Sequence, residues 1–174
     1  MYHVVIIDDE PIIVEGISKL VPWEKYGCMV TACAYDGKEG LTIIREKKPD
    51  IIFSDISMPG LDGLKMIAAL KSEFPDMQIS ILTGHRDFDY CQEAIRLGVC
   101  RFLLKPSKLE EIEEALAVMV EILKKKEVKE LLKEMQLRIV DISEIVGFTD
   151  VSHFSRVFKK LEGISANEYR NTKL

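Results

Sequence analysis

The sequence lacks any run of roughly eighteen apolar residues, the length that a membrane-spanning helix needs. It also lacks a charged leader followed by a cleavage site, because Met1 runs directly into a strand-like segment. Neither CxxC nor Cys/His ligand spacing occurs, which argues against a zinc or redox motif. We therefore expect a cytoplasmic protein with no membrane partner and with reduced cysteines that are either buried or incidental. The cysteines are Cys28, Cys33, Cys91 and Cys100.

The net charge of −5 conceals two parts of opposite sign. Residues 1–123 carry 13 basic and 21 acidic side chains, a balance of −8, whereas residues 124–174 carry 11 and 8, a balance of +3. An acidic first part suits a cation site, and a basic second part suits either a phosphate backbone or an ordinary solvated helix surface. At 174 residues, the chain has room for one full domain and a smaller second unit.

Four short apolar runs, separated by helix-length amphipathic stretches, have the composition of buried strands. Strands that alternate with helices predict right-handed βαβ units and a parallel sheet. Ligands of such sheets bind beyond the carboxyl ends of the strands, so side chains placed just after each strand should converge. The runs are His3–Ile7, Ile51–Ser54, Gln78–Leu82 and Val99–Leu104.

The residues that follow these runs are Asp8 with Asp9, Asp55, Thr83 and Lys105. Three carboxylates, a hydroxyl and an ammonium group would then meet at one edge of the sheet. This set suits Mg²⁺, a hard cation that binds carboxylate oxygens and retains waters, together with a phosphoryl group. One carboxylate could accept the phosphate, because the metal ion and the lysine would offset the negative charge of the donor.

Four separated motifs, in this order and at these strand ends, resemble a two-component response-regulator receiver domain. The resemblance spans roughly residues 1–123. It implies an α/β, flavodoxin-like (CheY-like) doubly wound sheet of five parallel strands in the order 2-1-3-4-5, followed here by a small all-α region. The motifs are Ile6-Ile7-Asp8-Asp9-Glu10-Pro11, Ser54-Asp55-Ile56-Ser57-Met58-Pro59-Gly60-Leu61-Asp62-Gly63, Leu82-Thr83-Gly84 and Phe102-Leu103-Leu104-Lys105-Pro106.

The resemblance implies a phosphoacceptor and a metal site. Transferred residue by residue, it makes Asp55 the phosphoacceptor and a sensor histidine kinase the phosphodonor. It implies that Mg²⁺ is held by Asp9 directly, by Asp8 largely through water, by Asp55, and by the carbonyl group of Ser57.

The resemblance also implies a switch that responds to the phosphoryl group. Thr83 would follow this group, Lys105 would pair with it, and Phe102 occupies the aromatic position that turns inward on activation. The peptide bond between Lys105 and Pro106 is expected to be cis.

An acidic cluster with a lysine also occurs in Mg²⁺-dependent phosphohydrolases. Those enzymes usually carry the nucleophile and the acid/base carboxylate two residues apart at one strand end. Here Asp8 and Asp9 are adjacent, and the expected acceptor Asp55 follows another strand. We therefore do not expect an enzyme.

A long helix is predicted from Ser107 to Gln136, because this segment contains neither glycine nor proline. Ser107 with Glu110 or Glu111 could form a capping box at its start. A stripe of apolar residues at three- and four-residue steps either covers the receiver sheet or forms a dimerising coiled coil. The stripe consists of Leu109, Ile112, Leu116, Met119 and Leu123.

The segments Leu137–Phe148 and Val151–Leu161 predict a helix-turn-helix with Gly147 in its turn. The second helix has no acidic residue up to Leu161 and carries Phe154, Val157, Phe158 and Leu161 on one face. The rest of its surface presents hydrogen-bond donors, as a helix in the DNA major groove would. Its candidate DNA contacts are Ser152, His153, Arg156, Lys159 and Lys160.

The string from Ile142 to Arg170 resembles the second helix-turn-helix of AraC-type transcription factors, in which Ser165 and Glu168 would cap a last short helix. The DNA-binding unit of that family is about twice as long and has two such modules. The resemblance divides the chain into a receiver domain at 1–123, a helical linker at 124–136 and a partial AraC-type region at 137–174.

Two functions from different classes fit these features. The first is a phosphorylation-controlled response regulator that binds DNA as a homodimer formed on activation, which would restore two modules. The second is a phospho-dependent dimerisation or decoy module whose shortened C-terminal region binds no DNA, because a single module loses half of the phosphate contacts.

Overall fold

The computed structural model describes residues 1–84, 88–134 and 136–172. The described chain falls into two compact units, Met1–Val120 and Glu121–Leu174. The described residues of the linker expected at 124–136 are grouped with the second unit. No helix among the described residues is long and apolar enough to cross a lipid bilayer.

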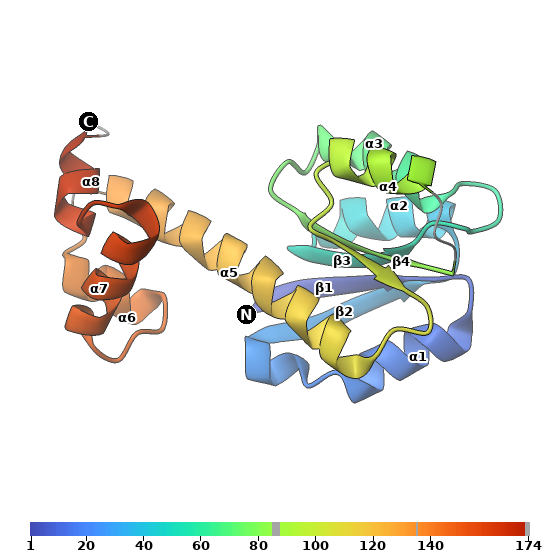
Figure 1. Cartoon of the computed structure of the whole chain (residues 1–174), viewed down its shortest axis with the longest axis horizontal. Helices are drawn as coiled ribbons and strands as arrows, with labels where there is room; N and C mark the ends of the chain where they lie inside the picture. Colours follow the sequence, from blue (N-terminus) through green and yellow to red (C-terminus); the bar gives the residue numbers. More distant parts are fainter. Residues whose placement is uncertain (85–87, 135, 173–174) are drawn as a thin grey trace. The chain divides into compact units, whose positions relative to one another are not determined.

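The first unit contains a five-stranded parallel sheet in the order β2-β1-β3-β4-β5, which confirms the predicted CheY-like topology. Helices cover both faces of this sheet, with α1 and α5 on one side and α2, α3 and α4 on the other (Figure 1). The strands are β1 (Tyr2–Ile7), β2 (Cys28–Ala34), β3 (Ile51–Asp55), β4 (Gln78–Thr83) and β5 (Arg101–Leu104).

The helices of the first unit are α1 (Pro11–Leu20), η1 (Trp23–Tyr26), α2 (Gly37–Lys47), α3 (Gly63–Lys71) and α4 (Phe88–Arg96). The long helix α5 (Leu109–Lys133) begins in the first unit and continues into the second. The second unit also contains α6 (Ile139–Ile145), α7 (Val151–Glu162) and α8 (Ala166–Thr172).

The sheet is buried on both faces, as expected for a doubly wound fold. Every residue of β3 is buried, and so are the last four residues of β1. One apolar cluster joins Val5, Ile52 and Ile79 of the sheet to Ile67 and Leu70 of α3. This packing holds the carboxyl ends of the strands at a common edge.

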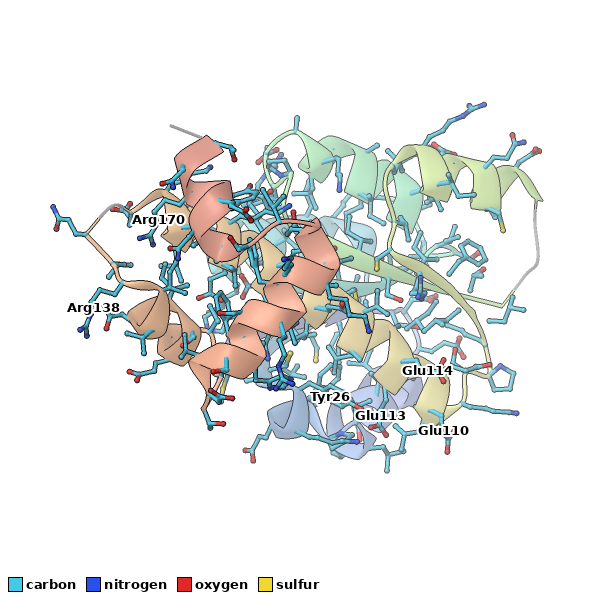
Figure 2. The ribbon with its side chains drawn as sticks, turned by 60° about the vertical axis from the view of Figure 1, so that its left-hand side comes forward. Tyr26, Glu110, Glu113, Glu114, Arg138 and Arg170 are labelled. Atoms are coloured by element: carbon cyan, nitrogen blue, oxygen red, sulfur yellow. The ribbon has the colours of Figure 1, made fainter. Side chains whose placement is uncertain are left out.

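Helix α5 supplies apolar side chains to both units. Its Ile112, Leu116 and Met119 are buried in the first unit, which confirms that the apolar stripe covers the sheet. Near its start, the hydroxyl group of Tyr26 in η1 donates to the Glu113 carboxylate at 2.6 Å (Figure 2). Lys25 pairs with the same carboxylate at 3.1 Å.

Several predicted element boundaries were wrong by up to three residues. The strand expected from Val99 begins at Arg101, because the Val99 N–H group donates to the Ala94 carbonyl at the end of α4. Helix α5 begins at Leu109 rather than Ser107: the Ser107 hydroxyl donates to the Leu104 carbonyl, and the Lys108 N–H group donates to the Glu111 carboxylate.

The same helix ends at Lys133, before the expected Gln136, and Met135 lies outside the described residues. The Glu134 N–H group there donates to the Leu131 carbonyl, a hydrogen bond of 3₁₀ type that closes a tighter turn than the α-helical one.

The second unit has an apolar core of its own. Val128 and Leu132 of α5 pack with Ile142 of α6 and with Phe154 and Phe158 of α7. The Phe154 and Phe158 rings lie 5.9 Å apart, and the Phe158 ring meets the Tyr169 ring of α8 edge-on at 5.7 Å. Few buried side chains therefore hold this unit together.

We expect Phe154→Ala to lower the free energy of unfolding of the second unit by roughly 3–5 kcal/mol, the usual cost of emptying a buried aromatic site. A unit of this size has little stability to lose, so far-UV circular dichroism should show loss of helix. Trp23, the single tryptophan, is buried in the first unit, and the unfolding midpoint from its fluorescence should stay unchanged.

The matched control is Ile145→Ala, which truncates a side chain that is 53% exposed on α6. Its cost should stay within about 1 kcal/mol. A Phe154→Ala protein that melts like the control would contradict a separate core built around Phe154.

Candidate functional site

The sheet brings the predicted polar side chains together at one edge. Asp8 follows β1 directly, Asp55 ends β3, Thr83 ends β4 and Lys105 follows β5. The strand register aligns these ends: Ile7 lies beside Ser54, Asp55 beside Leu82, and Thr83 beside Leu104. The side chains therefore converge beyond the carboxyl ends of four strands, as the sequence predicts.

Three carboxylates form a cluster at this edge. Asp8, Asp9 and Asp55 each place an oxygen atom within 4.8 Å of the others. Asp8 is fully buried and Asp55 is 3% exposed. Carboxylates this close repel one another strongly when they are buried, unless a cation lies among them.

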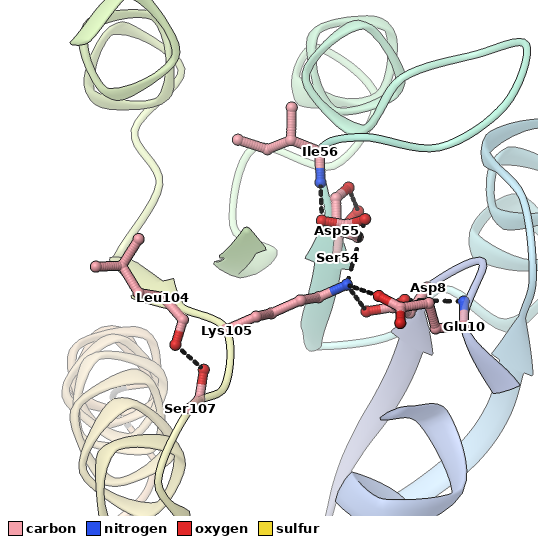
Figure 3. A network of polar contacts seen from close by, with 8 residues as sticks. All are labelled: Asp8, Glu10, Ser54, Asp55, Ile56, Leu104, Lys105 and Ser107. Carbon is pink, nitrogen blue, oxygen red and sulfur yellow. Dashed lines mark hydrogen bonds and ion pairs between the residues drawn. The ribbon is translucent and has the colours of Figure 1, made fainter. Parts of the chain in front are cut away.

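Lys105 is the cation that the structure places in this cluster (Figure 3). Its Nζ atom lies 2.7 Å from Asp8 Oδ2, 3.3 Å from Asp55 Oδ2 and 3.2 Å from Glu10 Oε1. The backbone N–H group of Lys105 donates to the Thr83 carbonyl at 2.8 Å, which ties the end of β5 to β4. The peptide bond to Pro106 is cis, as expected.

Burial controls how these groups ionise. Loss of water raises the pKa of the Asp8 carboxyl, and the hydrogen bonds from Lys105 and from the Glu10 N–H group offset this only in part. Burial alone would lower the pKa of Lys105, but the hydrogen bond to Asp8 and the charges of Asp8 and Asp55 outweigh it, so this pKa lies above its ordinary value. The ammonium group is therefore firmly held, while the ionised form of Asp8 would gain from a further cation.

The backbone fixes the Asp55 carboxylate. Asp55 Oδ1 accepts a hydrogen bond of 2.8 Å from the N–H group of Ile56, which leaves Oδ2 turned toward Lys105. The loop that follows returns at Gly63, whose N–H group donates to the Ile56 carbonyl at 2.9 Å. A Cβ atom at Gly63 would overlap the Asp55 carbonyl oxygen, so only glycine fits this approach.

The donor set fits a magnesium ion. Carboxylate oxygens are hard ligands, and the cluster of Asp8, Asp9 and Asp55 is of the kind that holds Mg²⁺ with several retained waters. Ser57 is exposed in the loop after β3. The partial neutralisation of Asp8 by Lys105 leaves carboxylate charge for a second cation to balance.

The remaining predicted residues lie around this cluster. Thr83 is fully buried at the end of β4. Phe102 of β5 is half-buried and packs against the apolar cluster of the sheet. Glu10 was missed from the sequence, although it directly follows the two aspartates and reaches Lys105.

The second unit contains the predicted helix-turn-helix. Helix α6 is shorter than expected. At its start the Asp141 carboxylate accepts a hydrogen bond of 3.0 Å from the Arg138 N–H group, and after its end the chain turns at Gly147, whose φ of 87° suits glycine. Asp150 caps α7 by accepting hydrogen bonds from the N–H groups of Ser152 and His153 at 2.9 and 3.2 Å.

The predicted DNA contacts lie on the exposed surface of α7, and Phe154 and Phe158 point into the core. Leu161, expected on the same apolar face, is 46% exposed. The His153 ring meets the Phe148 ring edge-on at 5.4 Å. The Ser165 and Glu168 capping box of α8 is present, with bonds of 2.8 and 3.2 Å. The exposed residues are Ser152, His153, Arg156, Lys159 and Lys160.

Comparison with known families gives two matches. Residues 4–117 match the response regulator receiver domain, and residues 93–172 match a helix-turn-helix domain. Among solved structures, the REC domain of AraT, a response regulator from Geobacillus stearothermophilus, is similar, with a TM-score of 0.69 and 38% identity. The match covers 72% of this chain and 97% of that domain.

Curated relatives include the transcriptional regulatory protein YesN of Bacillus subtilis, 35% identical over 128 residues, which are 74% of this chain and 35% of YesN. The chain spans 35% and 47% of the length of the first two relatives that it matches. HptR, a transcriptional regulatory protein of Staphylococcus aureus, is 29% identical and matches over 98% of this chain and 79% of HptR. That alignment extends over 205 positions against 174 residues, so at least 31 positions have no counterpart here.

We expect Gly63→Ala to lower the free energy of unfolding of the first unit by about 3 kcal/mol, because the added methyl group must displace the Asp55 carbonyl. Chemical denaturation followed by Trp23 fluorescence measures this change. Gly16→Ala is the control of opposite sign: no atom lies within 4 Å of its Cβ position in α1, and the gain in helix propensity should stabilise by about 0.5–1 kcal/mol. Equal effects of the two substitutions would contradict the tight approach at Gly63.

Proposed function

We propose a phosphorylation-controlled function for this chain, which belongs to the response regulators and combines their receiver domain with an AraC-type helix-turn-helix region. In this proposal a sensor histidine kinase phosphorylates Asp55, and the modified protein controls transcription by binding DNA. Residues 1–123 act as the receiver and residues 137–174, joined through 124–136, as the DNA-binding region. The observation that carries the proposal is the convergence of Lys105 with the three carboxylates at the sheet edge.

The chain would hold Mg²⁺ through Asp8, Asp9, Asp55 and the Ser57 carbonyl. The bound ion supplies charge neutralisation between the acceptor carboxylate and the phosphoryl oxygens. The burial of Asp8 supports this assignment, because its ionised form lacks full compensation from Lys105.

Asp55 acts as the nucleophile of phosphoryl transfer. A carboxylate oxygen of Asp55 forms the new bond to phosphorus, while the bond from phosphorus to the imidazole nitrogen of the donor breaks and its electron pair stays on that nitrogen. The hydrogen bond from the Ile56 N–H group orients the carboxylate before the reaction. The Lys105 Nζ atom already lies 3.3 Å from Asp55 Oδ2, so its ammonium group can pair with the phosphoryl oxygens after only a small movement of the side chain.

The phosphoryl group would then be sensed by Thr83 and Phe102. Thr83 ends the strand beside Asp55, so its hydroxyl can follow the new charge. Phe102 lies on the neighbouring strand and is only half-buried, which leaves it room to turn inward. Phosphorylation must favour the inward state energetically for this change to shift the population.

DNA binding would use the exposed surface of α7. Arg156 suits recognition of guanine, and Lys159 and Lys160 suit contacts to phosphate groups. The described residues contain one helix-turn-helix, formed by α6 and α7, and the alignment with HptR leaves at least 31 positions without a counterpart. A homodimer formed on activation would restore two modules.

Phosphorylation of Asp55 is the first test. Incubation with Mg²⁺ and acetyl phosphate should add one phosphoryl group, which intact-protein and peptide mass spectrometry would locate at Asp55. Chelation of the metal should abolish the modification, and Lys105→Met should slow it by about tenfold or more, because the approaching phosphate loses a charge partner.

The control is Asp55→Asn, which keeps the shape of the side chain and removes the nucleophile. An Asp55→Asn protein that still gains the phosphoryl mass would refute the assignment, as would a wild-type chain that gains none.

DNA binding is the second test. A duplex enriched by the activated protein from a random pool should bind with an affinity that falls steeply as salt rises, because lysine and arginine contacts release counterions. Arg156→Ala should weaken this complex by about 1–3 kcal/mol, measured by fluorescence anisotropy. A chain that is phosphorylated and dimerises, yet enriches no duplex even at low salt, would instead be a decoy or dimerisation module.

A further inference from the structure

Helix α7 carries a single acidic residue, and it stands at the last position. The sequence from Val151 to Leu161 has no aspartate or glutamate, and Glu162 follows directly after Lys159, Lys160 and Leu161. A carboxylate beside a surface that meets phosphate groups repels them, so this residue is unfavourable for DNA binding on charge alone.

Two lysines of α5 form ion pairs with Glu162, each with a different oxygen atom of its carboxylate. Lys125 Nζ lies 2.8 Å from Glu162 Oε1, and Lys129 Nζ lies 2.9 Å from Glu162 Oε2. The two lysines stand four residues apart, so they project from adjacent turns of one helix face. The Glu162 side chain is only 12% exposed, which distinguishes this contact from an ordinary surface ion pair.

The same face of α5 also holds α8. The Lys129 ammonium group lies 5.8 Å from the centre of the Tyr169 ring, and that ring packs edge-on against Phe158 of α7. Arg170, which Figure 2 labels, donates from Nε to the Leu132 carbonyl near the end of α5 at 3.2 Å. The polar contacts therefore bind α7 and α8 to α5 beside the small aromatic core.

The aromatic core alone fixes α7 incompletely. Phe154 and Phe158 are one turn apart and hold the middle of the helix, but Leu161 in its last turn is exposed. The polar contact that holds this last turn is the one between Glu162 and its two lysines. It sets the end of the helix that also carries Lys159 and Lys160.

We propose that the Lys125–Glu162–Lys129 contact is a positioning device that fixes the register of α7 on DNA, so that it supplies sequence selectivity at the expense of general affinity. This inference rests on the proposed DNA-binding function. It makes Glu162 a specificity-determining residue that need not touch DNA. The two lysines, although basic, are then engaged with Glu162 instead of with phosphate groups.

The test uses two variants that break the contact with opposite changes of charge. Glu162→Gln adds one positive charge, and the double variant Lys125→Met with Lys129→Met removes two. The probes are a duplex enriched by the wild-type full chain from a random pool, in Mg²⁺ and beryllofluoride, and poly(dI-dC) as non-specific DNA. Selectivity is the ratio of the two association constants, measured across a salt series.

Both variants should lose selectivity by about tenfold, the size expected when a coupled contact of this kind is broken. Their affinities for poly(dI-dC) should move in opposite directions, up for Glu162→Gln and down for the lysine double variant. Helix content by circular dichroism should remain that of the wild type, because the aromatic core is untouched.

The controls change charge at exposed positions of α5 for which no such contact is given among the described residues. Glu121→Gln adds one positive charge, as Glu162→Gln does, and Lys124→Gln removes one, half the change of the lysine double variant. They should change affinity for both DNAs alike and leave selectivity intact.

Three results would overturn the inference. The first is wild-type selectivity in both variants. The second is selectivity that rises in one variant and falls in the other, following charge alone. The third is a wild-type chain that enriches no duplex. This result would refute the proposed DNA-binding function itself, and it can be told apart from the first two results because it is obtained without any variant.

Discussion

The ion pair between Lys105 and Asp8 is the interaction on which the arrangement of the sheet edge depends. Asp8 is fully buried, and the ammonium group 2.7 Å away, together with the Glu10 N–H group, offsets part of the cost of burying its charge. The same ammonium group reaches Asp55 and Glu10, and it thus joins the ends of β1, β3 and β5. Since one lysine cannot neutralise three carboxylates, the site stays short of positive charge, and a divalent metal ion would supply it.

A different balance governs the second unit. Its core is small and combines four aromatic rings with aliphatic side chains of α5 and α6. Charged groups of α5 supplement that core by contacts to Glu162 and Tyr169. Helix α5 thereby serves two purposes along its length, covering the sheet through Ile112 to Met119 and supporting the helix-turn-helix through Lys125 to Leu132.

The sequence predicted the strand ends well, because hydrophobic runs and the polar residue after each one are local features. It predicted Asp8, Asp55 and Lys105 as neighbours, since parallel topology brings these ends together. No residues were assigned to the second strand, Cys28–Ala34, which lies at the edge of the sheet and whose residues Val30–Cys33 are only partly buried. The boundaries of α5 were missed, because hydrogen bonds of Ser107 and Lys108 decide where the helix begins.

Contacts between distant residues were beyond the reach of local patterns. The exposure of Leu161 and the burial of Glu162 by Lys125 and Lys129 depend on how α7 lies against α5, and helical periodicity predicts only which residues share a face. The role of Glu10 beside Lys105 likewise depends on the pairing of β1 and β5 with other strands.

A crystal structure of the full chain with Mg²⁺ and beryllofluoride would test the central claim most directly. The account predicts beryllium bonded to an Asp55 carboxylate oxygen, the metal ion among Asp8, Asp9 and Asp55, and the Lys105 ammonium group moved onto a fluorine atom. A structure grown under these conditions with Asp55 unmodified and Lys105 still paired with it, or with the fluoride bound elsewhere, would contradict the account.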